Sequence, residues 1–510
     1  MGCLRAGRGS SGWAGARALL VAASLGLLAC AGERVLGDFP PSSCDLADPP
    51  EKVTDAPLNI ATFWAEDGRE RDAFQALYGR IDKTRYAPGQ ATMSSRVDAQ
   101  RRITVAFDLQ RLPDVFQVNG GNDVLRWVEG RDTESTDVCA LDRLRDKYHW
   151  DRDYFESALA PLRCRGNLYG LPVGIHHLNV LFYNRKLFEE LRLTARQHDI
   201  ELVEPADLSG ASELLAQLRQ IAELAPLTAD GAPIVPLAIG AQSEWPLTIV
   251  AFENVLLSLG NDAYETLWQG GLIGDDGTRS AELRRTLKRM VGLLQELAEV
   301  SNLNEQLTWQ DALKQVEAGQ ALMTVTGDWG WAQLSEAAPD SVATVSFPGT
   351  GGVFVYTPDS FAVPREVMKD GFPAHYFLHD IVESKAAVLE FSALKHAIPA
   401  RNDLTDDDLQ RLPSASLRET YERFRSCDGR PDCKLLLAVS GLGLPPGTDP
   451  CFDEIDALLT LAVSGRAPPR DVIDARRCPV PFPPDRPAAA ERLIELLLTI
   501  GSRRFAPDCQ

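Results

Sequence analysis

The sequence predicts an α/β fold, in which short buried strands alternate with amphipathic helices. Brief runs of apolar, β-branched or aromatic residues, each typical of a buried strand, occur at 58–63, 180–183 and 353–356. Longer segments with helical periodicity lie between and after them. Strands interleaved with helices of this length favour α/β units and sheets of the parallel type.

Two segments show the helical signal most clearly. One helical face collects apolar side chains at steps of four, three, four and three residues, namely Leu283, Leu287, Met290, Leu294 and Leu297. Further on, Thr308 and Asp311 are spaced as a capping box, which predicts a helix start before 312–318. The three acidic residues at 406–408 are interpreted as another solvated helix start.

The composition is that of a folded chain with ample core. The chain has 510 residues, of which 45% are hydrophobic and 24% charged. That length usually corresponds to two or more compact units. The net charge of −20 repels phosphate backbones and anionic lipid surfaces, so nucleic acid is not expected as a partner.

The first 29 residues have the pattern of an export signal. Arg5, Arg8 and Arg17 precede an uncharged apolar run, 18–29, that is too short to remain as a membrane span. The run ends in Leu-Leu-Ala-Cys, which resembles the lipobox of bacterial lipoproteins, where a cysteine, here Cys30, carries lipid. Ordinary cleavage nearby is the alternative. We expect 30–56 to form the lipid anchor and tether of an exported protein, periplasmic or at the cell surface.

Eight further cysteines suit a disulfide set in an exported chain. Sequence proximity suggests the pairs Cys139 with Cys164, Cys427 with Cys433, and Cys451 with Cys478. Cys44 and Cys509 remain as a fourth candidate pair that would join the two ends of the chain. Neither C-x-x-C knuckles nor histidines at ligand spacing occur, so no metal is expected.

Motifs for catalysis and for cofactor binding are missing from the sequence. It contains no G-x-S-x-G elbow, H-E-x-x-H pair, phosphate loop or G-x-G-x-x-G turn. The carboxylates are too scattered for an acid and nucleophile pair to be chosen. We therefore expect a binding protein without cofactor or catalytic residues; a secreted glycoside hydrolase is the alternative from a different class.

Aromatic and polar residues instead gather near turn signals. A sugar presents hydroxyls at its ring edge and apolar C–H faces above and below, so its site needs both kinds of group. Clusters that supply both lie at 63–66, 113–121, 169–179, 244–246, 327–331, 356–361 and 395–401.

In their order along the chain, these segments resemble the carbohydrate-binding proteins of bacterial ABC importers, and most closely their glucose- and mannose-binding branch. The likeness covers about 58–403. The most specific pieces are 113–121, 169–184, 323–329, 347–349 with 359–361, and 398–401.

The resemblance implies a type II periplasmic-binding-protein fold, with two α/β lobes joined by crossover strands and a sugar held in the cleft between them. It assigns 55–174 with 347–395 to the first lobe. It assigns 175–343 with 400–510, including the cysteine-rich tail, to the second. The implied role is capture of a sugar, a monosaccharide such as glucose or mannose, for delivery to an ABC import permease. Presentation of the ligand to a sensor or chemoreceptor is the alternative.

The resemblance also places sugar contacts on both lobes. Trp64, Trp245 and Trp329 would stack on the sugar faces, and Asp359 would accept hydrogen bonds from two adjacent hydroxyls. The other implied ligand contacts are Phe63, Glu66, Gln117, Asn119, His176, Asn179, Lys395 and His396.

Three of these positions depart from the branch and bear on the identity of the sugar. Phe63 stands where the branch commonly has Trp, Glu66 belongs to a charged stretch in place of a small turn, and His396 replaces a Gly. Taken singly, each Trp is better explained by core packing, and only the shared setting of the three beside turn residues and polar neighbours favours a ligand role. Asp328 is interpreted as a helix N-cap rather than a ligand contact.

Overall fold

The computed structural model describes most of the chain from Thr54 to Gly501. The described residues are 54–62, 64, 68–80, 86–87, 91–93, 106, 112–128, 137–241, 247–268, 271–305, 307–335, 337–365, 372–412, 414–428, 430, 433–438, 455–466 and 483–501. The predicted export signal, Cys30, the tether, and the candidate pairs Cys44–Cys509 and Cys451–Cys478 lie outside them. Within the described residues, no helix is both long enough and apolar enough to span a membrane.

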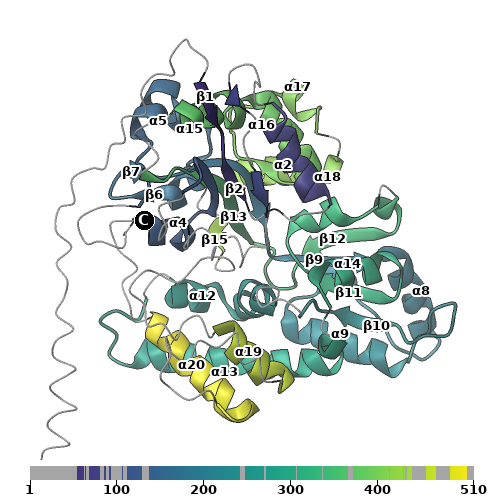
Figure 1. Ribbon diagram of the computed structural model, residues 1–510. Helices are drawn as coiled ribbons and strands as arrows, with labels where there is room; N and C mark the ends of the chain where they lie inside the picture. The colour runs from purple at the N-terminus through teal and green to yellow at the C-terminus, as the bar shows by residue number, and fades with distance from the viewer. Residues whose placement is uncertain are drawn as a thin grey trace, which may run out of the picture. The chain divides into compact units, whose positions relative to one another are not determined.

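Among the described residues, the first of two larger sheets has seven strands with mixed pairing. Figure 1 shows β2 and β13 of this sheet. Its order is β14-β8-β13-β5-β2-β4, and β15 pairs with β13. The strands are β2 (Ile60–Thr62), β4 (Ala91–Met93), β5 (Val115–Asn119), β8 (Leu171–His177), β13 (Val353–Ala362), β14 (Ile398–Pro399) and β15 (Lys434–Leu437). β2 is parallel to β4 and β5, whereas β13 is antiparallel to β5 and β8, so the expectation of parallel pairing holds for only part of the sheet.

Helices and short ladders surround this sheet, and we call the whole unit the first lobe. α2 packs on α16, and α16 also contacts β8. The helices are α2 (Arg69–Tyr78), α4 (Asn122–Val128), α5 (Asp142–Tyr148), α6 (Trp150–Asp153), α7 (Glu156–Leu159), η1 (Ala160–Leu162), α15 (Phe372–Tyr376), η8 (Phe377–Val382), α16 (Lys385–Lys395), α17 (Asp406–Leu409) and α18 (Ala415–Cys427). The ladders are β1 (Thr54–Pro57) with β3 (Tyr86–Ala87), and β6 (Arg163–Cys164) with β7 (Asn167–Leu168).

In the part of the chain that the structure describes, the second larger sheet has four strands in the order β10-β11-β9-β12. We call the unit around it the second lobe. Its strands are β9 (Val180–Asn184), β10 (Val235–Ala238), β11 (Ala321–Val325) and β12 (Val342–Ser346). Its helices are α8 (Arg185–Arg196), η2 (Pro205–Asp207), α9 (Ala211–Glu223), η3 (Ile249–Leu256), α11 (Leu257–Leu259), α12 (Asn261–Trp268), α13 (Thr278–Glu299), η4 (Leu303–Glu305), α14 (Trp309–Glu317), η5 (Asp328–Gln333) and η6 (Ala338–Asp340).

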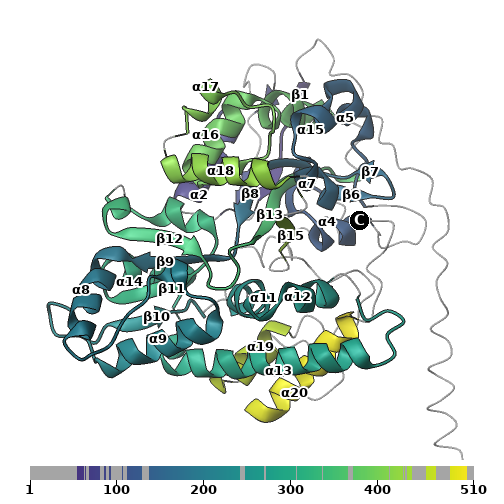
Figure 2. The same cartoon turned by 180° about the vertical axis from the view of Figure 1, so that it is seen from behind.

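The two helical predictions in this lobe are confirmed. The apolar face predicted between Leu283 and Leu297 is the buried face of α13. The capping box of Thr308 and Asp311 forms at the start of α14. Two further helices, α19 (Ile455–Ser464) and α20 (Arg486–Gly501), pack on each other and against α13, as both views show (Figure 2).

The buried apolar residues form two large clusters, one in each lobe. β13 belongs to both, because successive side chains of a strand point to opposite faces. Val353 and Val355 lie in the second-lobe cluster, whereas Phe354 and Tyr356 lie in the first-lobe cluster. β13 therefore crosses from one core to the other, and β8 and β15 run beside it.

The assignment of 400–510 to the second lobe is wrong for its first part. Leu417, Tyr421 and Phe424, on α18, belong to the first-lobe cluster, whereas Leu436 and the helices α19 and α20 belong to the second. The chain therefore changes lobe after α18, at β15, rather than at residue 400.

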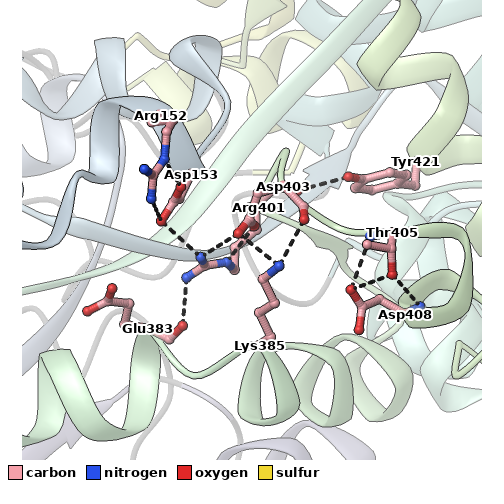
Figure 3. A network of polar contacts seen from close by, with 9 residues as sticks. All are labelled: Arg152, Asp153, Glu383, Lys385, Arg401, Asp403, Thr405, Asp408 and Tyr421. Carbon is pink, nitrogen blue, oxygen red and sulfur yellow. Dashed lines mark hydrogen bonds and ion pairs between the residues drawn. The ribbon is translucent and has the colours of Figure 1, made fainter.

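A polar network centred on Arg401 holds this segment in the first lobe (Figure 3). The Arg401 guanidinium makes a two-pronged contact with Asp403, at 2.8 and 2.9 Å, and donates to the Glu383 carbonyl at 2.6 Å. It also lies 3.4 Å from an Asp153 carboxylate oxygen. The Tyr421 hydroxyl donates to the Arg401 carbonyl at 3.0 Å. Segments distant in the sequence are thereby joined around one buried cation.

Cys427 and Cys433 form a disulfide across the turn between α18 and β15, with a Cα–Cα distance of 5.1 Å. This is one of the four candidate pairs. Cys139 and Cys164 are each disulfide-bonded as well.

Candidate functional site

Polar side chains line one face of the first-lobe sheet where β5, β13 and β8 lie side by side. Asn119 is opposite Asp359 in the pairing of β5 with β13, and Thr357 is opposite His176 in the pairing of β13 with β8. Directly opposed residues of neighbouring strands project from the same face, as do alternate residues of one strand. Gln117 joins this face, and its side chain accepts a hydrogen bond from the Thr62 hydroxyl. All five are less than a tenth exposed.

A buried cluster of one histidine and two carboxylates lies at the centre of this face. His176 Nδ1 is 2.7 Å from Asp328 Oδ1, and His176 Nε2 is 3.2 Å from Asp359 Oδ2. The first contact is a hydrogen bond, and the second is within ion-pair distance. Asp328 comes from η5 of the second lobe, so the cluster joins the two lobes.

The charge of His176 follows from these neighbours. Burial alone would lower the pKa of His176, but the carboxylates of Asp328 and Asp359 outweigh it and raise the pKa to about 9. Burial lowers the pKa of both His177 and His396 to about 4. At neutral pH, His176 is therefore an imidazolium, whereas the other two histidines are uncharged.

η5 carries Asp328 and two indoles against the first lobe. It contacts β8, α2 and α16. The Trp329 ring meets His176 edge to face, with ring centroids 5.3 Å apart, and is 9% exposed. Gly327 is needed beside it, because an added Cβ would fall 2.0 Å from the Trp329 ring. Trp331 lies near His396, at a centroid distance of 5.9 Å.

Several buried polar atoms around this cluster have no hydrogen-bond partner within the described residues. They are Asp328 Oδ2, Thr326 Oγ1, Thr357 Oγ1 and His396 Nδ1. Buried polar groups are nearly always paired, so such a concentration is typical of a site that a polar ligand completes. The described residues contain no group of three or more side chains suited to holding a metal ion.

Five of the implied contact residues besides His176 and Trp329 lie at this site. Asp359, Gln117 and Asn119 share the polar face of the sheet. His396 follows α16 and feels the charge of Asp328. Lys395 is buried next to it, and its ammonium is paired with the Glu70 carboxylate of α2.

Two implied contacts have structural roles instead. Trp64 is 1% exposed and packs between the rings of Phe74, Phe361 and Phe391, with no face left for a sugar. Flanking turn residues favoured a binding role in the sequence, but an indole after a strand end is equally able to close a core.

Asn179 fastens the crossover between β8 and β9. Its amide donates to Thr350 Oγ1 at 2.8 Å and to the Val353 carbonyl at 3.1 Å, and its oxygen accepts from the Val355 amide at 2.9 Å. It is fully buried. These contacts occupy the side chain, so the expectation of a ligand contact here is corrected.

The implied contacts Phe63, Glu66 and Trp245 lie outside the described residues.

Asp328 is the main site residue that the sequence analysis missed, because it was interpreted as a helix N-cap. The N-cap of η5 is Gly327 instead, and Asp328 is the first residue of η5. The two tryptophans that follow Asp328 in Gly-Asp-Trp-Gly-Trp were the feature of the sequence that could have indicated a site role for it. A separate hollow of about 530 Å³, lined by 206, 208–209, 345–349 and 351, includes none of these site residues.

The raised pKa of His176 predicts a loss of stability in mildly alkaline solution. The pKa lies at about 9 in the folded protein against an ordinary value of 6.5, so this contribution is complete below pH 6.5 and disappears as the pH rises through 9. We expect the free energy of unfolding to fall by about 2–3 kcal/mol across this interval. Denaturant unfolding at pH 6.5 and 9.5 measures the change.

His176→Gln is the control for this interval. His177 and His396 have lowered pKa values, so deprotonation of their imidazoles in the unfolded chain raises stability slightly as the pH rises above 6.5, which is the opposite direction. An equal loss in His176→Gln would contradict the assignment.

Comparisons with known proteins agree with this architecture. Residues 90–366, more than half of the chain, match the family described as bacterial extracellular solute-binding protein. An uncharacterised ABC transporter extracellular-binding protein of Pyrococcus horikoshii is 24% identical over 372 residues, which cover 71% of this chain and 76% of the relative. A probable sugar-binding periplasmic protein of Rhizobium meliloti is 26% identical over 309 residues, which cover 59% of this chain and 66% of the relative.

A solved chitin oligosaccharide binding protein has a similar fold, with a TM-score of 0.62 at 14% identity, covering 88% of this chain and all of that one. The two lobes with their crossing strands thus have the fold of the periplasmic binding proteins. The chain belongs to the bacterial extracellular solute-binding protein family.

Proposed function

We propose that this protein is the carbohydrate-binding component of an ABC importer and holds its sugar between η5 and the polar face of the first-lobe sheet. The observation that carries the proposal is the cluster of His176 with Asp328 and Asp359, because it unites groups from both lobes. A ligand that contacts both lobes stabilises their closed arrangement. The sugar-binding name of the Rhizobium meliloti relative supports the ligand class.

The side chains of the site fit a polyhydroxy ligand. Carboxylates accept hydrogen bonds from hydroxyls, and charge strengthens these bonds, which suits Asp359 and Asp328 to adjacent ring hydroxyls. We assign Trp329 to an apolar face of the sugar, since its indole borders the cluster. Gln117, Asn119 and the hydroxyl of Thr357 complete the ring-edge contacts. Lys395 and His396 would contribute from the end of α16.

The enclosed geometry favours a small ligand. His176, Asp328 and Asp359 are each no more than 6% exposed, so a ligand that reaches them is surrounded by protein. We therefore propose a monosaccharide, with glucose and mannose as first candidates. We further propose that the protein is exported, anchored through lipid on Cys30, and delivers the sugar to membrane permease subunits without transforming it.

A thermal-shift screen of the protein lacking residues 1–29 tests the function. The panel contains glucose, mannose, galactose, xylose, maltose and chitobiose. A ligand bound only by the folded protein at 100 times its Kd adds about 2.7 kcal/mol, which raises Tm by about 3 °C for a chain of this length. Isothermal titration calorimetry then gives Kd. Lack of any response across the panel would reject the proposal, and turnover of aryl glycosides would favour a hydrolase instead.

A further inference from the structure

The two lobes are also joined behind the crossing strands, on the side that faces away from the His176 cluster. Building on the proposed function, we propose that Arg423 is a positioning residue for sugar binding. It connects the lobes on this rear side and holds them in the arrangement that encloses the ligand. It acts through the second lobe and makes no contact with the sugar itself.

Arg423 connects the lobes through two hydrogen bonds. It lies on α18, whose buried apolar residues belong to the first-lobe cluster. Its guanidinium donates to Ser346 Oγ at 3.3 Å and to the Gly351 carbonyl at 3.2 Å. Ser346 is the last residue of β12 in the second-lobe sheet, and Gly351 lies between β12 and β13. The guanidinium therefore fastens a first-lobe helix to the end of a second-lobe strand.

Arg423 and the His176 cluster lie on opposite faces of the crossing strands. Adjacent residues of a strand point to opposite faces, so on β8 the side chain of His177 faces away from that of His176. His177 stacks on Phe354, with ring centroids 3.9 Å apart, and the Arg423 guanidinium lies 5.6 Å from the Phe354 ring centroid. Phe354 and Thr357 are three residues apart on β13, so they also face opposite sides. Arg423 is therefore on the rear side, behind the site.

This position determines how Arg423 affects the opening of the lobes. The crossing strands lie between the two sides, so a rotation that parts His176 from Asp328 brings the lobes closer together at Arg423. The guanidinium is already in contact with Ser346 Oγ and the Gly351 carbonyl. Further approach would be opposed by repulsion between these atoms and would spoil the alignment of both hydrogen bonds. Opening must therefore displace the Arg423 side chain.

The surroundings keep the guanidinium in this place. Arg423 is half-buried, and its guanidinium has a favourable cation–π contact with the buried Phe354 ring. Burial lowers the pKa of Arg423, but a guanidinium remains charged at neutral pH. Its hydrogen bonds to Ser346 and Gly351 therefore have a charged donor, which makes them stronger than neutral ones.

The experiment compares Arg423→Ala with the wild-type protein, using the preferred sugar of the thermal-shift panel. We expect Kd by calorimetry to rise about 5- to 20-fold, because the hydrogen bonds of a charged donor are lost from the closed arrangement. Stopped-flow tryptophan fluorescence should assign the change mainly to faster dissociation, since the closed form opens more readily. A role confined to folding would lower Tm but leave Kd and the dissociation rate of the folded protein unchanged.

Two further variants assign the effect to this contact. Arg425→Ala is the matched control on the same helix, because the Arg425 side chain is 45% exposed and lies 3.7 Å from the Glu422 carboxylate. Its Kd should stay within about 2-fold of the wild type. Ser346→Ala removes one acceptor on the second-lobe side, so it should raise Kd about 2- to 4-fold alone but add little to Arg423→Ala. Ser346→Ala also tests the proposal should Arg423→Ala fail to fold.

The outcomes separate this inference from the proposed function. An unchanged or lower Kd in a folded Arg423→Ala variant would overturn the inference while leaving sugar binding intact. So would an equal rise of Kd in Arg425→Ala, or effects of Ser346→Ala and Arg423→Ala that multiply fully. Absence of binding by the wild-type protein to every sugar of the panel would reject the proposed function, and the inference with it.

Discussion

Replacing Arg401 by alanine is expected to lower the free energy of unfolding by about 2–4 kcal/mol, because it removes a buried cation together with its hydrogen bonds. Asp153 keeps its contact with Arg152, and Asp403 keeps its contact with Lys385. The Arg401 side chain is 5% exposed and contacts Asp403, Asp153 and the Glu383 carbonyl. Its guanidinium also lies 5.0 Å from the Tyr154 ring centroid. Denaturant unfolding measures the loss.

Arg152→Ala is the matched control. Arg152 reaches the same Asp153 carboxylate at 2.8 Å, but its side chain is 73% exposed. Exposed ion pairs contribute little, so Tm should stay within experimental error of the wild type. Equal destabilisation by both substitutions would show that the buried Arg401 in Figure 3 contributes no more to stability than the exposed Arg152.

Asp359→Asn is expected to weaken binding of the preferred sugar at least about 100-fold. The substitution replaces a charged acceptor, which we assign to two hydroxyls, with a neutral one, and hydrogen bonds to charged groups contribute about 1.5–3 kcal/mol each. It also removes one of the two carboxylates that hold His176. Calorimetry gives Kd, and melting curves give the folded fraction.

Asn179→Ala provides the contrast, since the resemblance implied a ligand contact at both positions. Its side chain holds Thr350, Val353 and Val355 rather than facing the cluster. We expect a lower Tm with a sugar Kd within about 3-fold of the wild type, because lost buried hydrogen bonds cost stability. A large loss of affinity in a well-folded Asn179→Ala variant would contradict this assignment.

The local spacing of apolar residues was enough to predict individual helices and strands, because this spacing shows which face of an element is buried. The face of α13, the capping box of α14 and the strands at 180–183 and 353–356 all follow from such patterns. The lobe to which α18 belongs could not be predicted from such spacing. Its apolar residues fit either core, and the choice depends on the contacts of Arg401 with segments more than 200 residues earlier.

The site was predictable in its residue types but not in its pairings. Order along the chain indicated His176 and Asp359, whereas the role of Asp328 depends on how η5 meets β8. Trp64 was predicted as a ligand contact but lies in the core. An indole near a turn suits both a core and a sugar face, and only the three surrounding Phe rings decide between them.

The two walls of the site differ in how freely they tolerate sequence change. Every residue of β13 is buried, and the apolar side chains of the strand belong to the cores of both lobes. A substitution in β13 therefore disturbs packing as well as binding. η5 is a short 3₁₀ segment after β11, and Trp331 and Gln333 in it are partly exposed. Laboratory evolution towards a different ligand should therefore collect its substitutions in η5 and leave β13 as it is.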